Sequence, residues 1–340
     1  MPDPIYSFGD YLKQRFDYRV HKVTVNADLG CPNRDGSKAT GGCIYCNNKS
    51  FNPNRIRSNP DIESQIEAGK QVVRKRTGAE KVLAYFQAYS NTYAPLEYLE
   101  QLYERALKCH GVVGLVIGTR PDCVSREVLN LLASYQQRGL EIWLEYGLQS
   151  AHETTLTRIN RGHGFAEYAK TVRETRALGL PVCTHLILGL PGEDQTMMMQ
   201  SLERTLDVGT DGLKFHPLHI VRQTKLAHEW KSGDVPLLDQ QTYVSLVCDM
   251  LEKVPADCAI HRLTGTASED ILLAPDWCSK KWQVINAIYA EMGHRGSTQG
   301  CGFNHSISGL TENRVQQQLP PGSAQARSVQ VETGASLRAV

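Results

Sequence analysis

The chain has 340 residues, 41% of them hydrophobic and 21% charged, which is typical of a folded protein with one large domain and an extension. No stretch approaches the ~18 consecutive apolar residues of a transmembrane helix, so we expect no membrane partner. A net charge of +1 excludes a protein that binds polyanions through its overall charge. Contact with nucleic acid would therefore require a local basic patch.

The N-terminal segment, residues 1–20, begins with MPDPIYSFGDYLKQRF and precedes the first strand-like run. This beginning lacks the apolar stretch of a secretory signal. Ten cysteines are many for a chain without such a signal, and we interpret most of them as free thiols in a reducing compartment. We therefore expect a cytoplasmic protein without a structural disulfide.

Strand-like and helical patterns alternate between residues 21 and 222. The strand-like runs are mostly continuous and apolar, as in parallel strands covered on both faces. They are His21–Ala27, Val82–Gln87, Val112–Gly118, Glu141–Leu148, Pro181–Gly189 and Gly212–Ile220. The helical patterns are Ile62–Lys75, Leu96–Leu107, Ser125–Tyr135, Phe165–Leu178 and Met197–Val208. These repeats predict an α/β fold whose core, residues 21–222, is a partial (β/α)6 barrel.

The alternation weakens after residue 222. A helix is predicted over Tyr243–Leu251, a strand over Cys258–Leu263 and an amphipathic helix over Lys280–Met292. We interpret residues 223–309 as a C-terminal α+β extension packed on the barrel. Residues 310–340 are polar, with few large apolar side chains, and are expected to be a disordered tail.

Three cysteines, Cys31, Cys43 and Cys46, lie in a glycine-rich loop directly after the first predicted strand. The loop from Asp28 to Phe51 is longer than the ~12–15 residues of an ordinary connection, which indicates a function. Active sites of α/β barrels lie just past the carboxyl ends of the strands. Three thiolates rather than four indicate an iron–sulfur cluster with one iron left open.

Two other interpretations of these cysteines remain open at this point. Zinc would need a fourth ligand, and His21 lies at the wrong end of the strand. A chance spacing is the third interpretation, since C-x-x-C alone is a weak pattern. The other cysteines lack ligand spacing and are interpreted as small buried hydrophobic residues; they are Cys109, Cys123, Cys183, Cys248, Cys258, Cys278 and Cys301.

Several stretches at the predicted strand ends resemble the radical S-adenosylmethionine (AdoMet) superfamily. Besides the cysteine loop they are Tyr85–Pro95, Ile117–Cys123, Leu144–His163 and Leu186–Glu193. The cysteine spacing, eleven residues and then two, departs from the commonest form of three and then two. It is similar to the long-loop branch that contains the elongator catalytic subunit and the YhcC/YtqA-like proteins. His261–Trp282 resembles the YhcC type specifically.

The resemblance implies a radical AdoMet barrel in which Cys31, Cys43 and Cys46 hold a [4Fe–4S] cluster. AdoMet chelates the fourth iron in this superfamily, and its reductive cleavage yields a 5′-deoxyadenosyl radical that abstracts hydrogen from a substrate. A reducing electron donor such as a flavodoxin or ferredoxin is implied as a partner. No catalytic acid or base is identified.

Five further residues are candidates for AdoMet binding because they occupy matching positions of the family. Tyr45 is placed where relatives keep an aromatic ring near adenine, and Gln87 and Ser90 where they contact the AdoMet amino group. Glu145 and Gln149 are candidates for the ribose hydroxyls or the methionine part. The alternatives are a turn cap for Gln87 and Ser90, and a satisfied buried acid for Glu145.

Residues on the substrate side are less well defined by the sequence. Arg120 and Asp122 are interpreted as site residues or a structural ion pair, and His216 and His219 as candidates that face the substrate. Basic residues offer a phosphate-binding rim for RNA or ordinary solvated faces; they are Lys38, Lys49, Arg55, Arg57, Arg74, Lys75, Arg76, Lys280 and Lys281.

The branch resemblance implies tRNA as the partner. The elongator branch modifies the tRNA wobble uridine, and a YtqA-like member is thought to convert carboxymethylaminomethyluridine into its aminomethyl form. We therefore predict a radical AdoMet enzyme of tRNA wobble-uridine modification. One alternative is a radical enzyme that acts on a small metabolite or peptide. The other is a zinc-stabilised RNA-binding module without redox chemistry.

Overall fold

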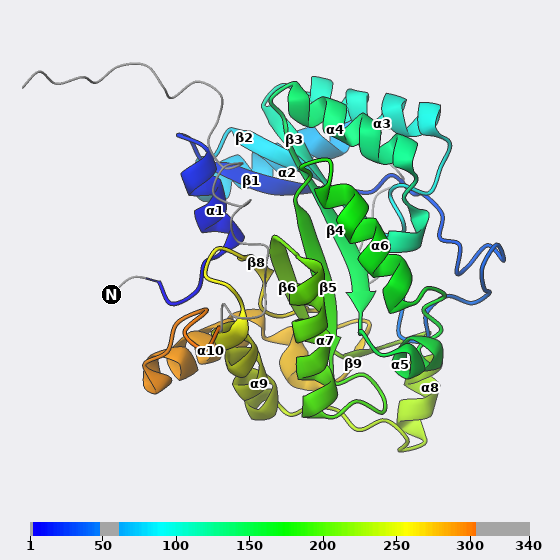
Figure 1. The fold of residues 1–340 in the computed structure, drawn as a ribbon, viewed down its shortest axis with the longest axis vertical. Helices are drawn as coiled ribbons and strands as arrows, with labels where there is room; N and C mark the ends of the chain where they lie inside the picture. Colours follow the sequence, from blue (N-terminus) through cyan, green and yellow to red (C-terminus); the bar gives the residue numbers. More distant parts are fainter. Residues whose placement is uncertain (1–2, 48–60, 304–340) are drawn as a thin grey trace, which may run out of the picture. The chain divides into compact units, whose positions relative to one another are not determined.

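Seven parallel strands form one curled sheet, a half-barrel, in the computed structural model, which describes residues 3–47 and 61–303 (Figure 1). Their order in the sheet follows the chain, so β1 and β8 are its two edges. The strands are β1 (Val20–Val25), β2 (Lys81–Phe86), β3 (Val112–Thr119), β4 (Glu141–Gln149), β5 (Val182–Leu188), β6 (Gly212–Pro217) and β8 (Ala259–Arg262). Parallel pairing brings all carboxyl ends to one rim of the half-barrel.

Helices cover the outer face of this sheet (Figure 1). They are α2 (Ile62–Thr77), α3 (Leu96–Lys108), α4 (Arg126–Gln137), α6 (Phe165–Arg176), α7 (Gln195–Val208) and α9 (Gln240–Lys253). Polar residues begin many of them: Asp61, Ser125 and Asp239 each accept a hydrogen bond from a backbone N–H of the first turn. None of the described helices is long and apolar enough to cross a membrane.

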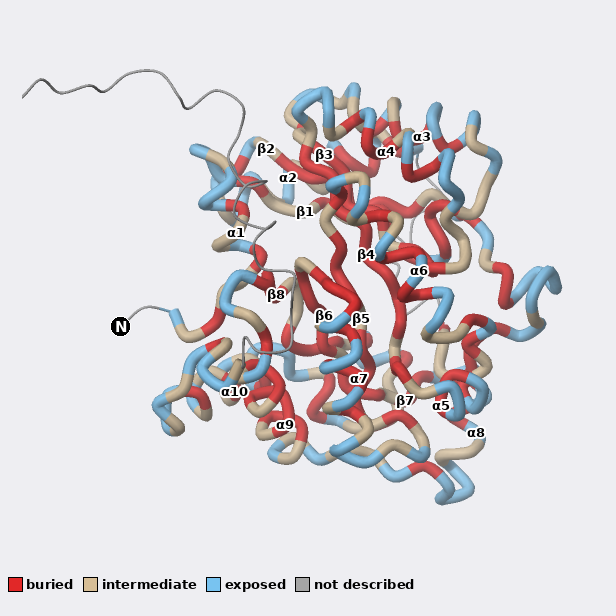
Figure 2. Tube along the Cα trace, viewed as in Figure 1, coloured by how far each residue is buried: buried red, intermediate tan, exposed pale blue. Residues whose placement is uncertain are grey.

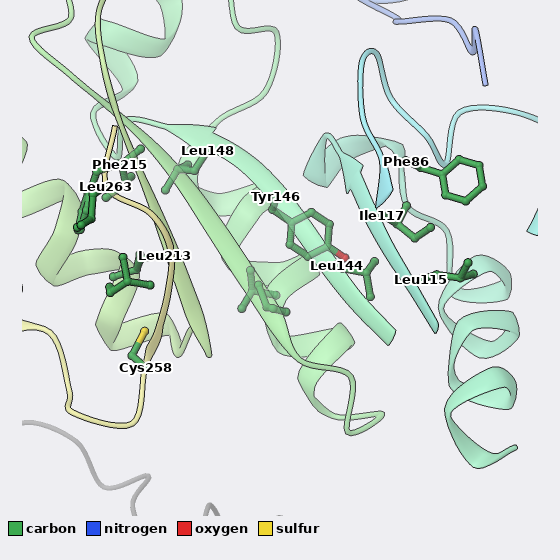
Figure 3. Close-up of a cluster of buried hydrophobic side chains, with 14 of the residues drawn as sticks. Phe86, Leu115, Ile117, Leu144, Tyr146, Leu148, Leu213, Phe215, Cys258 and Leu263 are labelled. Atoms are coloured by element: carbon green, nitrogen blue, oxygen red, sulfur yellow. The ribbon is translucent and has the colours of Figure 1, made fainter. Parts of the chain in front are cut away.

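The main core lies between the sheet and its outer helices. Figure 3 shows part of it, where Phe86, Ile117 and Leu144 project from neighbouring strands toward the helical layer. The central strands are buried along nearly their whole length (Figure 2). This burial explains why they are continuous apolar runs rather than alternating ones.

The inner face of the half-barrel has a core of its own at its amino-terminal end. Helix α1 (Phe8–Arg15) contacts both edge strands, β1 and β8, and its Phe8 ring packs edge-on against Trp143 at 5.3 Å. A capping box between Ser7 and Asp10 begins this helix. This apolar cluster fills the amino-terminal end of the half-barrel, and the cavity opens at the carboxyl ends of the strands.

The extension follows the prediction in its three elements and adds others. The strand expected over Cys258–Leu263 is β8, and it joins the main sheet beside β6 rather than standing apart. The predicted helices are α9 and α10 (Lys281–Arg295), which pack on each other. The short pieces α8 (Lys225–Lys231) and β9 (Leu272–Ala274) complete it, and β9 pairs with β7 (Ile220–Val221) at the end of the predicted core.

The α/β half-barrel predicted from the repeats is confirmed, with one strand more than the six repeats supplied. The domain limits at residues 20 and 222 stay predictions, and residues 310–340 lie outside the described part of the chain. Helices α1 and α5 (Glu153–Arg158) were not predicted.

Candidate active site

A cavity of about 200 Å³ opens at the carboxyl ends of the strands. Residues from β2 through β6, from β8 and from the cysteine loop line it, so it draws on most of the sheet. Each cofactor candidate from the sequence, Tyr45, Gln87, Ser90, Glu145 and Gln149, is among these lining residues. The structure thus brings them together, while their contacts with AdoMet stay predictions.

The cysteine loop folds over the rim so that Cys31, Cys43 and Cys46 line the same cavity. All three are free thiols; Cys43 is buried and the other two are partly exposed. Tight backbone turns shape the loop, with Cys46 N–H donating to the Cys43 carbonyl at 2.9 Å. Gly41 and Gly42 have φ of +79° and +81°, a conformation that side-chain-bearing residues rarely adopt.

Cationic and amide groups surround the thiols. Arg161 Nη1 and Asn33 Nδ2 each lie 3.5 Å from Cys43 Sγ, and Arg34 Nη2 donates to the Cys46 carbonyl at 2.7 Å. Arg161 is held in place by Nε, which donates to the Gly147 carbonyl at 3.2 Å. Burial and then Cys43 raise the pKa of Cys46 to about 11, against the effect of Arg34. A thiolate there therefore depends on a metal partner.

The backbone is strained at two strand ends that carry cofactor candidates. Gln149 has φ +80°, and Ala88 and Tyr89 beside Gln87 have φ of +69° and +60°. Non-glycine residues in this region cost of order 1–3 kcal/mol each and cluster at functional sites. A bulge between Gly147 and Gln149 accompanies the strain. The strain supports a binding role for these strand ends.

Arg120 and Asp122 form the bidentate ion pair that the sequence left as one of two interpretations. Arg120 Nε donates to Asp122 Oδ1 and Nη2 donates to Oδ2, each at 2.9 Å. Lys38 Nζ lies 2.8 Å from the same Oδ2. Burial alone would raise the pKa of Asp122, but Arg120 and Lys38 lower it to about 2. Arg120 also lines the cavity, and its buried Nη1 has no hydrogen-bond partner among the described residues. This donor fits an anionic or carbonyl group of a ligand.

Glu145 has four neighbours around its fully buried carboxylate. Oε2 contacts Lys214 Nζ and His185 Nε2, the latter at 3.2 Å. Oε1 lies 3.4 Å from Lys22 Nζ and 3.3 Å from His261 Nδ1. A carboxylate has about four acceptor positions, so none is left for a ribose hydroxyl. The geometry favours the alternative of a satisfied buried acid.

The electrostatics of this network follow from burial and from the excess of cations. Burial would raise the pKa of Glu145, but Lys214 and then Lys22 hold it well below its usual range. Burial lowers the pKa of Lys214 to about 7 although Glu145 opposes the shift. Within the described ranges, Glu145, Cys183 and His261 are close enough to share a metal ion. Two ammonium groups on Glu145 make a further cation unfavourable there.

Sequence reasoning missed Arg161, His185 and Lys214. Lys214 had a detectable signal, since a lone lysine in the apolar run GLKFHPLHI is unusual for a buried strand. Arg161 lies within the stretch Leu144–His163 that carried the resemblance, but nothing local connects it with Cys43. His216 and His219, expected to face the substrate, both line the cavity.

Comparisons with known proteins agree with this geometry. The family model described as the Radical SAM superfamily matches residues 30–205, and the Radical_SAM C-terminal domain matches residues 210–294. Protein YhcC of Escherichia coli (strain K12) is 42% identical, with 86% of this chain and 94% of that protein covered. YtqA of Bacillus subtilis (strain 168) is 38% identical over 85% of this chain and 90% of its own.

Among solved structures, the archaeal Methanocaldococcus infernus Elp3 with an N-terminal deletion has the same fold. The TM-score is 0.60, and the match covers 82% of this chain and 64% of that one at 19% identity.

Proposed function

Because the chain belongs to the radical S-adenosylmethionine superfamily, we propose that this radical AdoMet enzyme modifies the wobble uridine of tRNA, at a carboxymethylaminomethyl-type base. The superfamily uses a [4Fe–4S] cluster and AdoMet, which excludes the zinc-stabilised module as the main interpretation. When bound, these groups supply the radical that abstracts a hydrogen atom from the substrate.

The chain's own residues fit these cofactors. We propose that Cys31, Cys43 and Cys46 hold the cluster, since the three free thiols line one cavity. Arg161 and Arg34 place positive charge beside them, which favours thiolates. The unpartnered Nη1 of Arg120 would meet a polar group of AdoMet.

The observation that carries the RNA proposal is an exposed aromatic and basic surface at the start of α10. Trp282 at the start of α10 is 69% exposed, and Lys281 Nζ lies 5.6 Å from its ring centroid. Burial, then Arg262 and Arg76, lowers the pKa of Lys281, so these cations lie near one another. Arg262 also lines the cavity. A stacking ring among cations is typical of single-stranded nucleic acid binding.

The rest of the predicted basic rim supports RNA binding less. Lys38 is engaged by Asp122, and Arg74 contacts Glu80 at 3.2 Å. Trp277 is buried and anchors the extension, since its indole N–H donates to the Leu238 carbonyl at 3.2 Å. Lys49, Arg55 and Arg57 lie outside the described residues.

Reversing Lys280 and Lys281 to glutamate is expected to weaken tRNA binding and to flatten its salt dependence. Each lost phosphate contact should reduce the log–log salt slope by about 0.7–0.9. Trp282→Ala should weaken binding without changing the slope, because stacking releases few counterions. Reversal of the exposed Lys108 and Lys170, on the outer helices α3 and α6, is the matched control. An unchanged slope in the Lys280/Lys281 variant would remove α10 from the RNA site.

The modification itself is tested with the full chain, reconstituted anaerobically and incubated with AdoMet, a reductant and tRNA from a strain that lacks the gene. Nucleoside analysis by mass spectrometry should show a change at the wobble uridine. AdoMet cleavage with every tRNA nucleoside unchanged, and no tRNA binding at low salt, would favour the small metabolite or peptide as substrate instead.

A further inference from the structure

One cationic side chain of the cavity wall has no polar partner in the described part of the chain. Arg262 ends β8, is partly buried and lines the cavity, yet its side chain has no hydrogen-bond or ion-pair partner among residues 3–47 and 61–303. The other arginines of the wall are engaged: Arg34 on the Cys46 carbonyl, Arg120 on Asp122 and Arg161 on the Gly147 carbonyl. Burial favours pairing of a charged group, so an unpaired guanidinium that lines a cavity is available to an anionic ligand.

The acidic groups nearby do not balance this charge. Glu145 is the acidic residue among the lining residues described, and it is already shared by Lys214 and Lys22. Arg262 pairs in register with Lys214 across β6 and β8, so it adds positive charge beside an existing excess. Its proximity is one of the influences that lower the pKa of Lys214, after burial. An anion bound here would relieve this repulsion.

A second polar atom of the same wall also lacks a partner. His216 lines the cavity, and its Nε2 is buried without a hydrogen-bond partner in the described part of the chain. Burial and then Arg262 hold the pKa of His216 well below its usual range. The His185 ring lies beside it at a tilt of 33°, with ring centroids 5.7 Å apart. A buried polar atom ordinarily has a partner, so this imidazole is available to a ligand.

We propose that Arg262, with His216 beside it, binds a carboxylate of the substrate and so selects a base that carries one. The proposal rests on the proposed function, in which the modified uridine bears a carboxymethylaminomethyl group. The planar fork of arginine fits a carboxylate through two parallel hydrogen bonds. Arg262 also lies close enough to Lys281 to lower the pKa of that lysine, after burial, which links this wall of the cavity to the proposed RNA surface. AdoMet carries a carboxylate too, and the two sources are separated below.

The first experiment measures binding of two tRNAs that differ only at the wobble base, one with a carboxymethylaminomethyl and one with an aminomethyl group. Wild type should bind the first about tenfold to a hundredfold more tightly, as for a hydrogen bond to a charged group. Arg262→Gln should bind both equally, and Arg262→Lys should keep part of the preference. The Lys280/Lys281 reversal should weaken both tRNAs alike and keep the ratio. A preference that persists in Arg262→Gln would overturn the proposal.

The second experiment separates the two carboxylates and does not need RNA. AdoMet affinity of reconstituted Arg262→Gln should equal that of wild type, and a loss of tenfold or more would assign Arg262 to the cofactor and overturn the proposal.

Acetate should shift the His216 imidazole signals of wild type in NMR, relative to chloride at equal ionic strength, but not those of Arg262→Gln. Acetate shifts without any tRNA binding would reject the tRNA function and retain the anion site. Binding of tRNA without a carboxylate preference and without acetate shifts would keep the tRNA function and reject the anion site.

Folding of the variant gives a separate check. Because Arg262 has no partner and repels Lys214, Arg262→Gln is expected to melt at or above the wild-type temperature. A lower melting temperature would show that Arg262 stabilises the fold and would count against a ligand role.

Discussion

Replacement of Cys31, Cys43 or Cys46 by alanine, one at a time, is expected to abolish cluster retention and AdoMet cleavage. Each thiolate would hold a different iron, so the loss of any one leaves an incomplete ligand set. Cys43 should be the most sensitive, because Arg161 and Asn33 both approach its sulfur at 3.5 Å. Iron and sulfide content, and the brown absorbance after anaerobic reconstitution, measure the effect.

Cysteines away from the cavity provide the controls. Cys301 is exposed and Cys109 is partly exposed, and neither lines the cavity. Cys301→Ala and Cys109→Ala should therefore keep full iron content and AdoMet cleavage. If Cys43→Ala kept the chromophore and activity while a control lost them, the ligand assignment would be refuted.

The strands were predictable because each buried strand is a continuous apolar run with clear ends. β4, for example, begins at Glu141 as the run EIWLEYGL predicts and ends at Gln149. Helix α1 was missed because its eight residues give little periodicity. Its capping box from Ser7 to Asp10 was the available signal.

The Glu145 network was not predictable from the sequence, for a physical reason. Its partners come from four other strands: Lys22 on β1, His185 on β5, Lys214 on β6 and His261 on β8. Which inward-facing residues meet depends on strand register and on the curl of the sheet, which no local pattern encodes. Cys43 and Arg161 are likewise 118 positions apart. The candidate cluster cysteines could be predicted from a local motif, whereas the charged side chains that surround the site could not.

Glu145→Ala is expected to lower the free energy of unfolding by about 3–5 kcal/mol, because it leaves Lys214 buried without its counterion. AdoMet affinity should change little, since the four contacts leave the carboxylate no acceptor position for the cofactor. Urea denaturation of the protein without cofactors measures the first effect. Unchanged stability with a tenfold to hundredfold loss of AdoMet affinity would restore the expected cofactor contact.

A double substitution tests whether the loss comes from the unpaired ammonium. Glu145→Ala combined with Lys214→Met removes both charges, so it should be more stable than Glu145→Ala alone. Lys214→Met alone leaves Glu145 with Lys22 at 3.4 Å and should cost less than Glu145→Ala. Strictly additive effects would show that the two side chains are not coupled.

The pH dependence of stability checks the same network, with a sign that follows from the two pKa shifts. The folded-state pKa of Glu145 is depressed, so its contribution is present above the unfolded value of about 4.3 and is lost as the pH falls through the folded value. The pKa of Lys214 is about 7 in the folded state and about 10.4 in the unfolded state. Between about pH 7 and about pH 10.4 the folded protein therefore binds fewer protons than the unfolded protein. Stability should rise with pH across that interval, and Lys214→Met should remove the rise. An equal rise in the variant would assign it to another group.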